Sequence, residues 1–88
     1  MDVVYTDRAL DDLKGLQKSD RRRVVAKVAG LAETPVPARA KKLKGDWAHL
    51  ADVVYRVRCG DYRILYSVSH DAGEVLVLTI GNRKNVYR

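Results

Sequence analysis

The sequence predicts an α+β domain in which a short N-terminal strand and a two-helix hairpin precede an antiparallel sheet of about four strands. Apolar residues recur at helical spacing in two segments between residues 7 and 32. Two later runs rich in Val, Ile and Tyr alternate in polarity on either side of a Gly-Asp pair, and a nearly unbroken apolar run spans residues 75–80. Because both helices must bury their apolar stripes, we expect them to pack on one face of the sheet.

In the N-terminal part, residues 3–5 are predicted to form the first strand. Thr6 is the expected N-cap of a helix that runs to about Lys18, and a second helix restarts at Ser19. Prolines in residues 33–38 end the second helix. The apolar stripes of the two helices are Ala9, Leu10, Leu13 and Leu16, followed by Val24, Val25, Val28, Leu31 and Ala32.

Between the helices and the sheet lies a strongly basic segment. Residues 39–44 hold four cations and no acid, namely Arg39, Lys41, Lys42 and Lys44. The pattern leaves two alternatives open, a solvated loop and a contact with backbone phosphates of RNA. Trp47 follows in a turn, where a lid on the edge of the core is favoured over a platform for base stacking.

The pair Gly60-Asp61 predicts a tight hairpin turn with positive φ at Gly60. This register places Arg58 directly opposite Arg63, with Arg56 diagonally close. Like charges opposite each other destabilise a sheet, and no acid falls on this face of either strand. We therefore favour an anion site over a solvated face whose arginines splay into water. The other face carries Val53, Tyr55, Val57, Ile64, Tyr66 and Val68.

The C-terminal tail adds cations and a tyrosine. If the strand at residues 75–80 runs antiparallel to the Arg63 strand, it delivers Arg83, Lys84 and Tyr87 beside the arginines. For Tyr87 the sequence leaves open a second role, a hydrophobic peg that anchors the terminus. No His or carboxylate is an obvious member of this set, so protease, glycosidase and metal-dependent nuclease chemistry lack groups that they need. No residues have metal-ligand spacing, and we expect no metal and no cofactor.

A cluster of guanidinium groups suits a phosphate whose transition state gains negative charge. RNA supplies its own nucleophile, the 2′-OH, so an enzyme needs only alignment, a proton acceptor and charge stabilisation. Tyr87 is the only evident titrating group here, and neighbouring cations favour its phenolate. The residues alone make RNA cleavage possible without establishing it.

The length and composition predict one small domain, residues 1–88, in which basic residues outnumber acidic ones. Seventeen Lys and Arg residues outnumber 11 Asp and Glu, which gives a net charge of +6 and suits nucleic acid or an acidic protein as partner. The single Cys59 cannot form an internal disulfide, and no signal peptide or membrane-spanning apolar run occurs. We therefore expect a cytoplasmic protein that does not bind membranes.

Residues 55–66 together with residues 81–88 resemble the RelE toxin family of bacterial type II toxin–antitoxin systems, and the resemblance covers essentially the whole chain. It implies a bacterial toxin with a compact α+β fold and an antitoxin partner whose acidic or amphipathic helix masks the basic cleft. In RelE itself the activity is cleavage of mRNA in the ribosomal A site. The resemblance therefore implies the ribosome and mRNA as further partners.

The resemblance also implies roles for single residues. Tyr87 corresponds to the proposed general base, and Arg83 to the proposed leaving-group or charge-stabilising residue. Arg63 matches an arginine of RelE, whereas Arg56 and Arg58 stand where the best-known RelE has two lysines. Two other functions share the fold: a ParE-like toxin that inhibits DNA gyrase by binding, and an inactive homologue that only binds its antitoxin.

Overall fold

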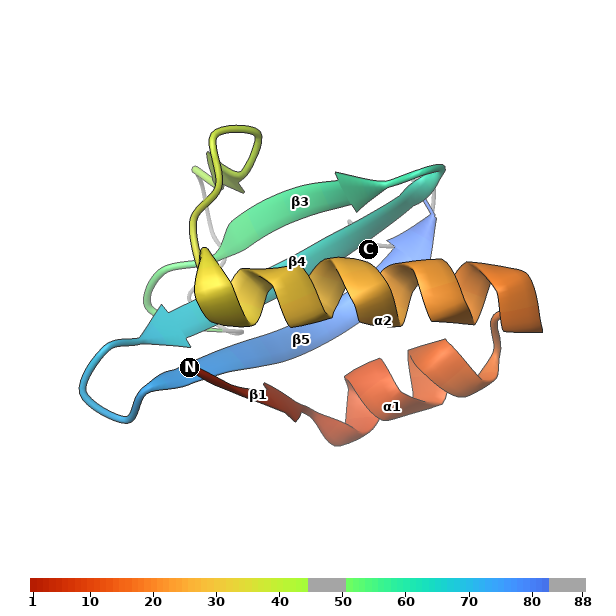
Figure 1. Ribbon diagram of the computed structural model, residues 1–88, viewed down its shortest axis with the longest axis horizontal. Helices are drawn as coiled ribbons and strands as arrows, with labels where there is room; N and C mark the ends of the chain where they lie inside the picture. Colours follow the sequence, from red (N-terminus) through yellow and green to blue (C-terminus); the bar gives the residue numbers. More distant parts are fainter. Residues whose placement is uncertain (45–50, 83–88) are drawn as a thin grey trace.

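The computed structural model describes residues 1–44 and 51–82, and it confirms the predicted α+β architecture. Both helices lie on one face of a five-stranded sheet with the order β1-β5-β4-β3-β2 (Figure 1). None of the described helices is long and apolar enough to cross a membrane. The elements are β1 (Asp2–Tyr5), α1 (Asp7–Lys14), α2 (Lys18–Glu33), β2 (Lys41–Lys42), β3 (Tyr55–Cys59), β4 (Tyr62–Ser69) and β5 (Glu74–Asn82).

The sheet is antiparallel except at one edge, where β1 pairs in parallel with β5. The strand beyond the expected four is β2, which falls inside the basic segment. Lys41 pairs there with Arg56 of β3, and Lys42 pairs with Tyr55. Strand β4 is therefore central, and β5 is the inner strand that the apolar run at residues 75–80 predicted.

The main core lies between the helices and the sheet. Tyr66 is fully buried there, and its ring stacks on Tyr55 with centroids 5.7 Å apart. Its hydroxyl donates to the carbonyl oxygen of Pro35 at 2.7 Å, which satisfies a buried polar group and ties the connection after α2 to the central strand. The fully or largely buried members of this core are Ala9, Leu13, Val24, Val28, Leu31, Val57, Ile64, Tyr66, Val75, Val77 and Ile80.

Two residues of the predicted apolar stripes lie on the surface instead, which corrects the sequence prediction. Leu10 is 41% exposed and Val25 is 44% exposed. The helical period alone does not show how much of each helix surface the sheet covers. On α2 that side is narrow, since the buried residues are Val24, Val28 and Leu31.

The break between the helices also differs from the prediction. Helix α1 ends at Lys14 with Gly15 as its C-cap, earlier than the predicted Lys18, and α2 already begins at Lys18. The Arg21 guanidinium donates to the carbonyl oxygens of Leu13 at 3.1 Å and Leu16 at 3.0 Å. A helix end needs such partners for its last carbonyls, so a side chain of α2 holds the end of α1 in place.

The predicted N-cap and hairpin turn are both confirmed. The Thr6 hydroxyl accepts a hydrogen bond from the amide of Ala9 at 3.1 Å, as an N-cap does. Gly60 has φ +59°, the left-handed conformation that the turn requires. A Cβ at Gly60 would lie 2.8 Å from a guanidinium nitrogen of Arg23, so α2 packs closely on the hairpin tip.

Candidate functional site

The predicted arginine cluster lies on the sheet face opposite the helices, called here the arginine face and defined by Arg56, Arg58 and Arg63. Arg58 pairs directly with Arg63 across β3 and β4, as the turn predicted. Side chains alternate along a strand, and the neighbouring Val57 and Ile64 belong to the core under the helices. The three arginines therefore share one face.

Arg63 is the most unusual member because it is buried. Only 7% of the residue is exposed, and its Nε has no hydrogen-bond acceptor within the described residues. Neither β3 nor β4 contains an acidic residue, and Glu74 lies at the far end of β5, opposite Ser69. A buried charge without a counter-ion costs several kcal/mol, so this position is poised for an anion.

The residues paired with Arg63 on the two neighbouring strands differ in charge and size. On β5 it faces Gly81, which has no side chain. On β3 it faces the exposed Arg58. Arg56 is half-buried and faces Lys41 of β2, and paired residues point to the same side. The positive charge thus extends from β4 across β3 to β2.

The other cations of the basic segment are exposed but do not all join this face. Arg39, Lys41, Lys42 and Lys44 are exposed. Lys41 faces Arg56, whereas Lys42 faces Tyr55, whose ring belongs to the helix side of the sheet. The structure therefore brings Lys41 to the arginines and turns Lys42 away from them.

Several residues singled out in the sequence lie outside the described part of the chain. These are the candidate site residues Arg83, Lys84 and Tyr87, together with Trp47. The strand that leads to the tail does run antiparallel to β4, with Gly81 opposite Arg63 and Asn82 opposite Tyr62. The expected direction of β5 is thus confirmed, while the placement of the three tail residues stays a prediction.

Two tyrosines among the described residues are poor proton acceptors. Burial raises the pKa of Tyr66 to about 12. The hydrogen bond from the Tyr62 hydroxyl to a carboxylate oxygen of Asp20, at 3.1 Å, raises the pKa of Tyr62. Both rings pack with the core under the helices. Tyr62 and Tyr66 are therefore not candidates for a base on the arginine face.

A residue that sequence reasoning missed is Asp12 of α1. One of its carboxylate oxygens accepts hydrogen bonds from the Thr79 hydroxyl and from the Ile80 amide, both at 2.9 Å. These partners lie in β5, shortly before the residue that faces Arg63. No pattern in the sequence marks Asp12, because it is one of several acids on a short helix.

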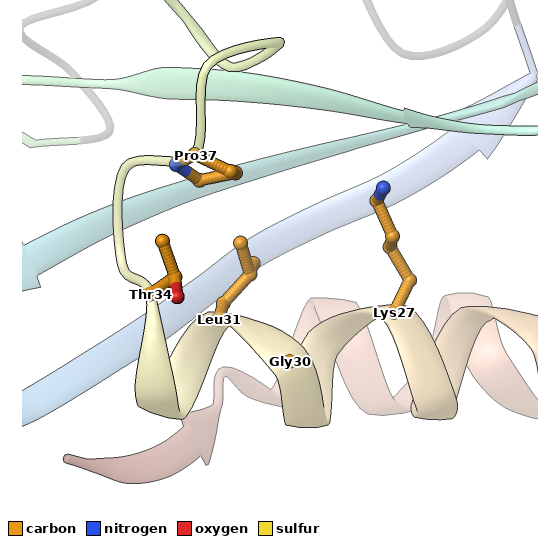
Figure 2. A pocket seen from close by; sticks show the side chains of 5 residues that line it. All are labelled: Lys27, Gly30, Leu31, Thr34 and Pro37. Atoms are coloured by element: carbon orange, nitrogen blue, oxygen red, sulfur yellow. The ribbon is translucent and has the colours of Figure 1, made fainter.

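Another hollow among the described residues contains two carboxylates and an imidazole, and it is lined by Ala51, Asp52, Ser67, Val68, Ser69, His70 and Asp71. A hollow of about 160 Å³ at the C-terminal end of α2 is lined by Lys27, Gly30, Leu31, Thr34 and Pro37, with Lys27 as its single charged side chain (Figure 2). It lies on the helix side of the sheet, away from the arginine face. Residues 1–44 and 51–82 contain no group of three or more His, Cys, Asp or Glu side chains that could hold a metal ion.

Comparison with known proteins connects this geometry to a family. Residues 3–87 match the model of a family described as the ParE toxin of the type II toxin–antitoxin system parDE. A Methanocaldococcus jannaschii protein named as toxin RelE1 is 33% identical over 92% of this chain and 88% of its own length.

Solved structures agree with this assignment. The RelBE2 toxin–antitoxin complex of Mycobacterium tuberculosis contains a chain with 26% identity and a TM-score of 0.79, over 93% of this chain and 96% of that one. The archaeal RelE–RelB complex of Pyrococcus horikoshii gives 29% identity and a TM-score of 0.77, over 97% of both chains. This chain therefore belongs to the ParE toxin family, within the RelE/ParE superfamily of type II toxin–antitoxin toxins.

Proposed function

We propose that this toxin is a metal-independent endoribonuclease that cleaves mRNA on the ribosome and is neutralised by a cognate antitoxin. The observation that carries the proposal is the buried guanidinium of Arg63, uncompensated among the described residues and facing Arg58. A phosphodiester in the transition state of cleavage bears the extra negative charge that such a pair would stabilise.

In the proposed reaction the RNA supplies the nucleophile. The 2′-oxygen attacks the adjacent phosphorus, the bond from phosphorus to the 5′-oxygen breaks, and the products are a 2′,3′-cyclic phosphate and a 5′-hydroxyl. Arg58 and Arg63 would hold the non-bridging oxygens, since guanidinium groups remain protonated and pair well with phosphate. Arg56 would bind the neighbouring phosphate, because it lies two residues before Arg58 on the same face.

Proton transfer is assigned to the tail. Tyr87 is the proposed acceptor of the 2′-OH proton, and its pKa would fall next to the arginines. Arg83 would stabilise the charge that develops on the leaving 5′-oxygen, which takes up a proton from water as it departs. The raised pKa values of Tyr62 and Tyr66 support this assignment by making those two tyrosines unsuitable as bases.

The basic segment is proposed to follow the RNA backbone away from the cleavage point. Lys41 is best placed, since it faces Arg56 across β2 and β3. Arg39, Lys42, Lys44 and Lys84 would add phosphate contacts or long-range attraction. These cations carry no base-specific information, so codon choice would come from the ribosome and from other contacts.

For the antitoxin we propose an acidic or amphipathic helix that covers Arg56, Arg58 and Arg63. Two solved structures with similar chains are toxin–antitoxin complexes, which supports a cognate antitoxin as the partner. Acidic side chains over the arginine face would offset the exposed charge of Arg58 and the buried charge of Arg63. The same contact would exclude RNA.

A second candidate function is inhibition of DNA gyrase by binding, because the matching family is that of the ParE toxin. Controlled expression without antitoxin separates the two. The endoribonuclease predicts rapid loss of protein synthesis with DNA replication intact at early times. Gyrase inhibition predicts filamentation and DNA-damage signalling before translation declines. An inactive homologue that only binds its antitoxin predicts neither effect.

A further inference from the structure

The outer edge of β5 changes its partner halfway along the strand. The parallel ladder with β1 ends where Tyr5 meets Val77. Beyond that point the partner of β5 is Thr6, the N-cap residue of α1. The Thr6 amide donates to the carbonyl oxygen of Val77 at 3.0 Å. The Thr6 hydroxyl donates to the carbonyl oxygen of Leu78 at 2.8 Å. The helix therefore continues the hydrogen bonding that the strand began.

The same stretch of β5 contains a bulge. Leu65 faces Thr79 while Tyr66 faces Val77, so Leu78 is an extra residue on β5. A bulge bends a strand and changes the direction of the residues that follow it. Here those residues are Gly81, which faces Arg63, and Asn82, which precedes Arg83 in the sequence.

Asp12 holds the far side of this bulge. A single carboxylate oxygen accepts from the Thr79 hydroxyl and from the Ile80 amide, each at 2.9 Å. Hydrogen bonds to an ionised acceptor are the stronger kind. Thr6 bonds the carbonyl oxygens of Val77 and Leu78, and Asp12 bonds Thr79 and Ile80, so hydrogen bonds hold the bulge at both ends.

We propose that Asp12 is a positioning residue for the site on the arginine face. Its carboxylate sets the direction in which the end of β5 passes Arg63, where Gly81 faces that arginine. This inference rests on the proposed endoribonuclease function, since that reaction takes place at Arg63. A displacement of about 1 Å in reacting groups can lower the rate by about 10²-fold. A carboxylate that fixes the bulge can therefore change the rate without contacting the RNA.

The test compares four variants with the full-length protein in a translating extract with defined mRNA. Asp12→Ala removes the acceptor, whereas Asp12→Asn keeps a side-chain oxygen that can accept both bonds. Thr79→Val removes one donor and keeps the side-chain shape. Asp11→Ala is the matched control, because Asp11 is an exposed carboxylate on the same helix. Circular dichroism confirms that each variant is folded at the assay temperature.

We expect Asp12→Ala to lower kcat by about 10²-fold with KM within about twofold, while Asp12→Asn recovers most of the rate and Asp11→Ala matches the wild type. Thr79→Val falls between them. A purely structural role would lower the folded fraction without separating kcat from KM. Equal kcat in Asp12→Ala and the wild type would overturn the proposal. If Asp12→Ala does not fold, unchanged kcat in Thr79→Val overturns it instead.

A second measurement keeps this inference separate from the proposed function. Hydrogen exchange of the Ile80, Gly81 and Asn82 amides should become about tenfold faster or more in Asp12→Ala, or in Thr79→Val if that variant is used, and stay unchanged in Asp11→Ala. If the wild type does not cleave mRNA, the proposed reaction is wrong, and the exchange rates still decide whether Asp12 positions the end of β5. Unchanged exchange in the tested variant would contradict it.

Discussion

Arg58 and Arg63 face each other directly on neighbouring antiparallel strands, and Arg63 is buried. Two like charges at paired positions lower the stability of a sheet. The arrangement therefore weakens the fold, and in the proposed function a bound phosphate offsets the two charges.

Replacing Arg63 with Met should remove activity while leaving the fold at least as stable. The change deletes a buried charge that has no acidic partner within residues 1–44 and 51–82, so it removes a desolvation cost and keeps a long apolar side chain. Loss of one group that stabilises transition-state charge should lower cleavage by about 10²–10³-fold. Urea unfolding and single-turnover cleavage measure the two effects. Arg22→Met on the exposed side of α2 is the control, with both quantities unchanged.

Ala at Gly60 and Ala at Gly73 should destabilise the protein by similar amounts. Both glycines have positive φ, +59° and +66°, so a left-handed backbone costs each Ala about 1–2 kcal/mol. At Gly60 the new Cβ would also meet a guanidinium nitrogen of Arg23, at 2.8 Å, but this is the end of a flexible side chain that is 63% exposed and can move aside, and nothing lies within 4 Å at Gly73. Thermal unfolding of both variants, and of Gly60→Ala combined with Arg23→Ala, checks this. A clearly larger loss at Gly60 that Arg23→Ala relieves would contradict it.

Tyr66 should make stability fall between about pH 10 and pH 12. Burial, and then the neighbouring Tyr55, raises the pKa of its hydroxyl from the ordinary value of 10.0 to about 12 in the folded protein. A raised folded pKa means that the stabilisation is complete below about pH 10 and is lost as pH rises toward about 12. At about 1.4 kcal/mol per pKa unit, the loss is about 2–3 kcal/mol.

Tyr66→Phe isolates this effect, since it removes the titrating group and keeps the ring. At neutral pH it should cost about 1 kcal/mol, because the hydrogen bond to the Pro35 carbonyl oxygen is lost. From about pH 10 the wild type should lose this advantage, and near pH 12 it should be less stable than Tyr66→Phe by about 1–2 kcal/mol. A difference that stays constant over this range would contradict the assignment.

RNA affinity should fall steeply with salt, and Lys41 should account for part of the slope. For single strands each neutralised phosphate contributes about 0.7 to the slope of log affinity against log salt concentration. Lys41→Ala should reduce the slope by about that amount because Lys41 faces Arg56. Lys18→Ala, at the exposed start of α2, should not. Titration of a short labelled RNA at several salt concentrations separates the two variants.

The sequence could predict the structural features that depend on residues close together in the chain. The Gly60-Asp61 turn sets the register of β3 and β4, and that register alone puts Arg58 opposite Arg63. The Thr6 cap follows from its side chain and position in the same way. For this reason the arginine face can be predicted from the sequence alone.

The features that sequence reasoning missed depend on contacts between distant segments. Helix α1 ends at Lys14 with Gly15 as its C-cap, and Arg21 of the next helix bonds the carbonyl oxygens of Leu13 and Leu16. The parallel pairing of β1 with β5 joins the two ends of the chain, and Asp12 acts on residues of β5 far along the sequence. None of these partners is visible in a local pattern.

The most direct test of the central claim is primer extension on a defined mRNA in a translation reaction, with wild-type protein and Arg63→Met side by side. We predict a new 5′ end inside the ribosome-bound codons with the wild type, and intact mRNA with the variant. Intact mRNA with folded wild-type protein, or equal cleavage by Arg63→Met, would contradict the proposed role of the arginine face.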